Sequence, residues 1–176
     1  MDNLFQRSWL VFIRIQATTV VLILLAIVLV TLANVLLRFL GPGSLTWADE
    51  FARVFFVMFS FLAAALACGF GAHLVVDGIV NKATGIIRTV IHAFQALVAG
   101  VFFLTIVVIG YMQTLDNLGQ RTPAIDFPVG VMYGAVSFSG VLMLVNSLMA
   151  SALGAVSVHA GRLVLGEPEE LLEEVA

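Results

Sequence analysis

The chain has 176 residues, of which 61% are hydrophobic and only 11% carry a formal charge. Soluble domains usually contain about 25% charged residues, so this composition excludes an ordinary water-soluble globular protein. The formal net charge is -3, and no basic patch suggests a nucleic-acid partner.

Four apolar stretches are long enough to cross a bilayer, whose hydrocarbon core of roughly 30 Å requires about 20 apolar residues per helix. They cover residues 15–37, 54–72, 89–115 and 127–158. We therefore predict an all-α integral membrane protein with four transmembrane helices at about 15–39, 47–73, 88–114 and 128–155. Residues 1–166 would form this domain, and residues 167–176 an acidic cytoplasmic tail.

The arginines and lysines predict that both chain ends lie in the cytoplasm, because short cytoplasmic loops are enriched in these residues. Five fall on the side of the N-terminus and three on the other side: Arg7, Arg14, Lys82, Arg88 and Arg162, against Arg38, Arg53 and Arg121. The connections near residues 41–45 and 117–128 are then outside, and we expect the second of these to be ordered and non-helical.

The segment before residue 15 places aromatic and aliphatic side chains around Arg7 and Arg14. Such a segment either lies among the lipid headgroups or extends the first helix. The apolar stretch behind it is longer than the roughly 7 to 15 residues of a secretory signal and has no small-residue cleavage site. We therefore expect a helix that is retained in the mature protein.

The densest charged cluster lies at the start of the second helix, where Thr46 is placed to act as the N-cap. Asp49 and Glu50 precede Arg53 by four and three residues, so both carboxylates can reach that arginine on one helix face. Trp47 suits the aromatic belt of a membrane surface, and Arg38 ends the facing first helix. The cluster indicates either an anchor that sets the depth of the helix or a brace between helices or subunits.

A second polar pair, His73 and Asp77, lies four residues apart at the inner end of the second helix, where a hydrogen bond between them is easy. Together with His92 near the same membrane face, His73 has the chemistry to ligate a haem. Histidine is also ordinary at helix ends, so we predict an interface role for His73 and Asp77 and no bound metal. The single cysteine, Cys68, excludes a disulfide within one chain.

Small residues recur at four-residue spacing and predict close helix packing. They are Ala63, Ala67 and Gly71, with Ala64, Cys68 and Ala72 beside them, and Gly130 and Gly134, followed by Ser137, Ser139 and Gly140. The middles of the predicted helices contain no ionisable residue, whereas coupled transporters bind substrate or ions at such sites or at broken helices. We expect a supporting subunit and not an enzyme or an independent pump.

Several motifs occur together and in order along the chain. They are Asn34-Val35-Leu36-Leu37-Arg38, then residues 44–53 (SLTWADEFAR), then His73-Leu74-Val75-Val76-Asp77, and finally residues 122–128 (TPAIDFP). Together they resemble the small membrane subunit, the DctQ-like subunit, of tripartite ATP-independent periplasmic (TRAP) transporters. The resemblance covers nearly the whole chain except the acidic tail, and Gly41-Pro42-Gly43 and Asp49 depart from the family pattern.

The resemblance implies a complex in the bacterial inner membrane. A large permease would carry substrate and sodium, and a periplasmic binding protein would deliver an organic acid. This chain would be a scaffold that contacts both proteins and membrane lipids, without a cofactor and with sodium only in the permease. Its expected interface residues are Arg38, Trp47, Asp49, Glu50 and Arg53 near the outer surface, and His73 and Asp77 near the inner one.

Two alternatives remain open at this point. A small haem or quinone redox subunit would use His73 and His92. A stand-alone channel would assemble from several copies of the chain.

Overall fold

The computed structural model describes residues 2–41, 43–70 and 86–153. Its helices are α1 (Asp2–Leu40), α2 (Ala48–Gly69), α4 (Ile86–Asp116) and α5 (Val129–Leu153), and all four are long and apolar enough to cross a membrane. In the described ranges the only β pairing is an isolated bridge between Arg121 and Pro128. The predicted all-α membrane fold is confirmed. The tail at 167–176 lies outside the described residues.

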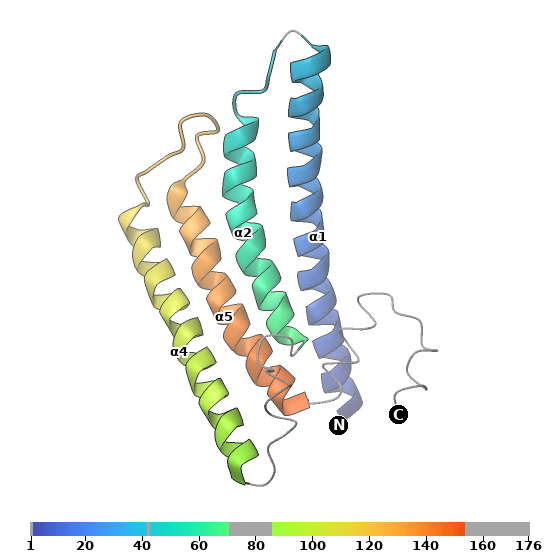
Figure 1. Cartoon of the computed structure of the whole chain (residues 1–176), viewed down its shortest axis with the longest axis vertical. Helices are drawn as coiled ribbons and strands as arrows, with labels where there is room; N and C mark the ends of the chain where they lie inside the picture. Colours follow the sequence, from blue (N-terminus) through green and yellow to red (C-terminus); the bar gives the residue numbers. More distant parts are fainter. Residues whose placement is uncertain (1, 42, 71–85, 154–176) are drawn as a thin grey trace.

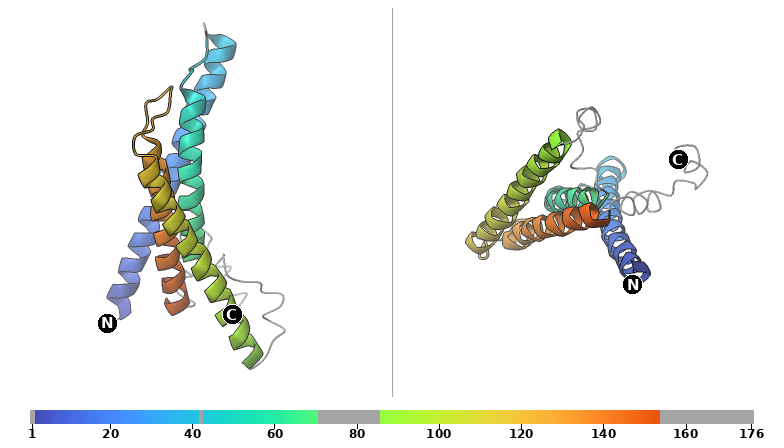
Figure 2. Two further views of the ribbon diagram at one scale, coloured as in Figure 1. Left: turned by 90° about the vertical axis from the view of Figure 1, so that its left-hand side faces the viewer. Right: turned by 90° about the horizontal axis from the view of Figure 1, so that it is seen from below.

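The helices stand in a row in the order α1, α2, α5, α4 (Figure 1). α2 packs against both α1 and α5, and α5 also packs against α4. Seen from below in Figure 2, α2 and α5 lie in the centre, with α1 and α4 on either side. The connections at 41–47 and 117–128 lie at one end of this row, which we call the outer end because the basic residues predict that it faces outside.

α1 begins at Asp2, so the segment before residue 15 extends the first helix. At 1.5 Å per residue, its 39 residues measure about 58 Å, nearly twice the roughly 30 Å of a hydrocarbon core. A narrow stripe of α1 is buried, formed by Trp9, Ile13, Ala17, Val20 and Ile27. The spacing of this stripe follows the helical period, so α1 uses one edge for packing and leaves its other apolar side chains exposed.

Glycines set the closest approaches between the helices. A Cβ at Gly110 would lie 2.9 Å from the backbone nitrogen of Ser137, and one at Gly69 would lie 2.7 Å from Cδ1 of Ile13. Both distances are too short for a real Cβ. At Gly110 the obstacle is backbone, so only glycine allows α4 to approach α5 this closely, whereas at Gly69 the obstacle is the end of the Ile13 side chain, which can shift.

The predicted close packing of the last helix is confirmed, and its partner is α4. Gly130 lies against the backbone of Thr114 and Asn117, and Gly140 lies against Val107. In α2 the buried small residues are Ala48, Ala65, Cys68 and Gly69, which include only one member of the predicted rows, Cys68.

The turn into α2 is held by α1 and not by Thr46. The N-cap of α2 is Trp47, whose side chain makes no capping hydrogen bond, so the prediction of Thr46 as the cap is wrong. Instead, the backbone nitrogen of Leu45 donates to Oδ1 of Asn34 at 2.8 Å, and Nδ2 of Asn34 donates to Oδ1 of Asp49 at 3.3 Å. A single carboxamide in the last turns of α1 therefore orders both the connection and the first turn of α2.

Candidate functional site: the outer end and a buried amide pair

Residues 117–128, which we call the outer loop, form an ordered turn between α4 and α5. The backbone nitrogen of Thr122 donates to the carbonyl of Phe127 at 3.0 Å, and that of Asp126 donates to the carbonyl of Thr122 at 3.1 Å. The nitrogen of Val129 donates to the carbonyl of Gln120 at 3.0 Å. These hydrogen bonds pair several backbone donors and acceptors of the loop with one another, as expected for a rigid turn. The predicted ordered, non-helical connection is confirmed.

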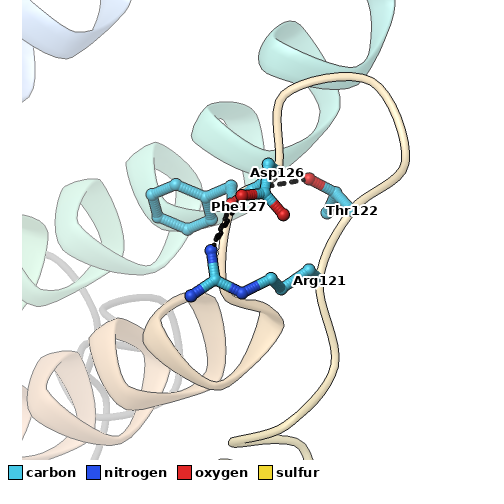
Figure 3. Close-up of polar contacts among 4 residues, drawn as sticks. All are labelled: Arg121, Thr122, Asp126 and Phe127. Atoms are coloured by element: carbon cyan, nitrogen blue, oxygen red, sulfur yellow. Dashed lines mark hydrogen bonds and ion pairs between the residues drawn. The ribbon is translucent and has the colours of Figure 1, made fainter.

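Side chains reinforce the same turn (Figure 3). Nη1 of Arg121 forms an ion pair with Oδ2 of Asp126 at 2.9 Å and also donates to the carbonyl of Asp126 at 3.2 Å. The backbone nitrogen of Phe127 donates to Oγ1 of Thr122 at 3.0 Å. Asp126 has a φ of 50°, a left-handed conformation that aspartate tolerates better than most residues do.

Glu50 attaches the outer loop to α2. Glu50 is only 6% exposed, and its Oε2 accepts hydrogen bonds from the backbone nitrogens of Ala124 at 2.6 Å and Ile125 at 3.0 Å. The ring of Phe127 adds an apolar contact, with its centroid 6.0 Å from that of Phe55. A carboxylate that accepts two amide hydrogens is stabilised although it is buried. Glu50 thus joins two segments that are more than 70 residues apart.

The ion pairs expected within α2 are not formed. In the described part of the chain the only ion pair is Arg121–Asp126, so neither Asp49 nor Glu50 pairs with Arg53. Glu50 instead satisfies two amides that would otherwise lack a protein partner. An ion pair with the exposed Arg53, one turn away, would stabilise the carboxylate less, because exposed ion pairs contribute little in water.

The other predicted interface residues are spread around this site. Arg38 is exposed at the end of α1 and forms no hydrogen bond or ion pair with any residue in the described ranges. Trp47 is partly exposed and meets the edge of Phe51, with ring centroids 6.1 Å apart. The inner pair, His73 and Asp77, lies outside the described residues.

A hollow of about 520 Å³ opens beside this site, between α2, the outer loop and the start of α5. Its polar lining includes Glu50, Arg53 and Arg121, and its apolar lining includes Val54, Val57 and Met132. Arg53 forms no polar contact within residues 2–41, 43–70 and 86–153, so its charge is uncompensated there.

A second polar group lies deep between the helices and was missed by the sequence analysis. Asn146 of α5 is completely buried, and its Nδ2 donates to Oε1 of Gln16 in α1 at 3.0 Å and to the carbonyl of Ala65 in α2 at 2.6 Å. Nε2 of Gln16 returns a bond to Oδ1 of Asn146 at 3.3 Å. This amide pair connects three helices.

A usable signal for the amide pair was present in the sequence. Asn146 is the only carboxamide in the apolar stretch 127–158, and a polar side chain in lipid must find a partner in another helix. The sequence did not identify that partner, because Gln16 lies 130 residues away.

A row of membrane-crossing helices, with charged groups at one rim and a paired carboxamide deeper down, defines a multi-pass membrane protein. The family model described as tripartite ATP-independent periplasmic transporters, DctQ component, matches residues 27–157. The chain belongs to this family, as the motifs predicted. It is therefore a transporter subunit of the bacterial inner membrane and not an enzyme, which removes the haem or quinone alternative.

One curated relative has a comparable sequence. The chain is 28% identical over 124 residues to the ectoine TRAP transporter small permease protein TeaB of Halomonas elongata. The alignment covers 68% of this chain and 63% of that relative, which is less than two thirds of the relative's length.

Proposed function

We propose that this chain is the non-catalytic scaffold subunit of a sodium-coupled TRAP transporter. It packs against the large permease and supports the uptake of an organic acid delivered by a periplasmic binding protein. The substrate and the sodium ions bind to the other two proteins.

The observation that carries this proposal is that the helix row contains no ionisable residue at hydrocarbon depth and that its buried carboxamide is already hydrogen-bonded. Residues 15–37, 54–70, 93–115 and 129–153 contain no Asp, Glu, Lys, Arg or His. Asn146, the largest fully buried polar side chain among the described residues, uses both amide hydrogens on protein acceptors. A solute or ion in transit needs unsatisfied polar groups at this depth, and Asn146 offers no such donor.

The exposed faces of the two flanking helices support a partner in the membrane. Leu22, Leu25 and Leu29 of α1 are each at least half exposed, and α4 exposes Leu97 and Phe102 to a similar degree. Because helix association in lipid depends on packing and not on hydrophobic drive, such faces suit either lipid or a neighbouring helix. Their position at the two ends of the row leaves both accessible to the permease.

The outer end supports a role in positioning. Glu50 and the internal bonds of the outer loop hold a rigid surface, and Arg38, Trp47, Asp49 and Arg53 are exposed around it. We propose these residues as the outer interface with the permease and the binding protein, and we retain His73 and Asp77 as the proposed inner interface.

The test is gentle detergent purification with a tag on this chain, followed by identification of co-purifying proteins. We expect a large hydrophobic permease, and we expect less of it with Glu50→Gln or Arg53→Ala. Asp116→Asn, an exposed charge change at the outer end of α4, serves as the control. Unchanged complex yield and transport in both variants would contradict the proposed interface. Solute movement by this chain alone in liposomes would instead support the stand-alone channel.

A further inference from the structure

The hollow beside Glu50 and Arg53 presents one cationic and one anionic group that do not neutralise each other. Glu50 uses Oε2 for the amides of Ala124 and Ile125, while its Oε1 accepts no hydrogen bond from any described residue. Arg53 forms no ion pair with it, and the nearby charge of Arg121 is compensated by Asp126. A ligand that carries both a negative and a positive group would match this pair.

The depth of the hollow places it at the level of lipid headgroups. α2 has 22 residues, and at 1.5 Å per residue it measures about 33 Å, close to the roughly 30 Å of a hydrocarbon core. Glu50 and Arg53 lie within the first two turns of this helix, so they are at the boundary between headgroups and hydrocarbon. Trp47, just before them, is the residue type that concentrates at this boundary.

The walls of the hollow change from polar to apolar along α2. Val54 and Val57 follow Arg53 toward the membrane interior, and Met132 of α5 faces the same space. A volume of about 520 Å³ is within the range of small-molecule sites, roughly 300 to 1,000 Å³. Charged groups at the rim with apolar walls below them fit an amphiphile better than a free ion.

We propose that this hollow binds one aminophospholipid of the outer leaflet, with its phosphate on the guanidinium of Arg53 and its ammonium on Oε1 of Glu50. The upper parts of its acyl chains lie along Val54, Val57 and Met132. Guanidinium is well suited to phosphate, because its planar set of donors matches the phosphate oxygens. The bound lipid fills the space between α2 and the outer loop, and this binding does not require the permease.

The proposal is tested by native mass spectrometry of the full chain in mild detergent. Palmitoyl-oleoyl phosphatidylethanolamine, palmitoyl-oleoyl phosphatidylglycerol and inorganic phosphate are added separately. We expect one bound phosphatidylethanolamine, weakened about tenfold by Arg53→Gln because a charge-assisted contact is lost. Arg38→Gln is the matched control, since Arg38 is another exposed arginine of the outer end that does not line the hollow.

A second variant keeps the test decisive if Arg53→Gln disturbs folding, which circular dichroism would detect. Val57→Trp fills the hollow without removing a charge and should also weaken lipid binding. Equal lipid binding by the wild-type chain, Arg53→Gln and Val57→Trp would overturn the proposal, as would equal loss in Arg38→Gln. Equal affinity for phosphatidylglycerol would overturn the ammonium contact. Displacement of the lipid by inorganic phosphate would show a site for a free anion instead.

Discussion

The outer end and the helix row are held together by different means. At the outer end a buried carboxylate accepts two backbone amides, and an exposed arginine pairs with an exposed aspartate. In the helix row, glycines bring backbones together, and one carboxamide pair connects α1, α2 and α5.

This difference follows from the solvent at each level. Near the headgroups water is available, so charges are tolerated and irregular backbone can be ordered by hydrogen bonds. In hydrocarbon, apolar burial provides no net drive between helices, so contact distance and the few polar partners determine stability. Changes in the helix row should therefore cost more than changes at the outer end.

The largest effect is expected for Gly110→Leu. The new Cβ would meet the backbone of Ser137 at 2.9 Å, and α4 would have to separate from α5. Overpacking of this kind should cost about 3 kcal/mol of unfolding free energy, measured by denaturation in mixed micelles. Gly100→Leu, in the same helix but with nothing within 4 Å of its Cβ position, should have little effect. Equal losses in the two variants would show that the close approach is not important.

The next effect is expected for Asn146→Leu. It leaves the half-buried amide of Gln16 without its partner, which should cost about 2 kcal/mol in the same assay. Adding Gln16→Leu removes the stranded amide, so the double variant should be more stable than the sum of the single losses predicts. Strict additivity would argue that the two carboxamides act independently.

A smaller effect is expected for Glu50→Ala, and it should be local. The amides of Ala124 and Ile125 lose a charged acceptor, at a cost of about 1.5 kcal/mol. Hydrogen exchange at these two amides should accelerate about tenfold, while exchange in the helix row stays unchanged. Asp49→Ala, which removes a neighbouring carboxylate without a contact to the outer loop, is the control. Protection that survives in Glu50→Ala would mean that the outer loop holds its conformation without α2.

The smallest effect is expected for Arg121→Gln. The side chains of Arg121 and Asp126 are 58% and 78% exposed, so their ion pair should contribute no more than about 0.5 kcal/mol. High salt should remove the difference between the wild-type chain and the variant, because exposed charges are screened. A large loss that persists in salt would instead indicate that the bond from Arg121 to the carbonyl of Asp126 holds the turn.

The amino-acid sequence by itself determined the number of membrane-crossing helices, the ordered outer loop and the family. These features depend on local properties: the length of apolar stretches, the positions of prolines and charges, and short motifs such as residues 44–53. The same local logic failed at Thr46 and at Arg53, because the actual partners of the second helix come from Asn34 and from the outer loop.

Only the tertiary structure decided the order of the helices in the row, the attachment of Glu50 to Ala124 and Ile125, and the pairing of Gln16 with Asn146. These contacts join residues 74 to 130 positions apart, and many apolar or polar side chains were equally suitable partners by type. In lipid all apolar helix faces are chemically alike, so the shapes of the helices and the distances between them determine which faces pack together. Neither property is visible in a local sequence pattern.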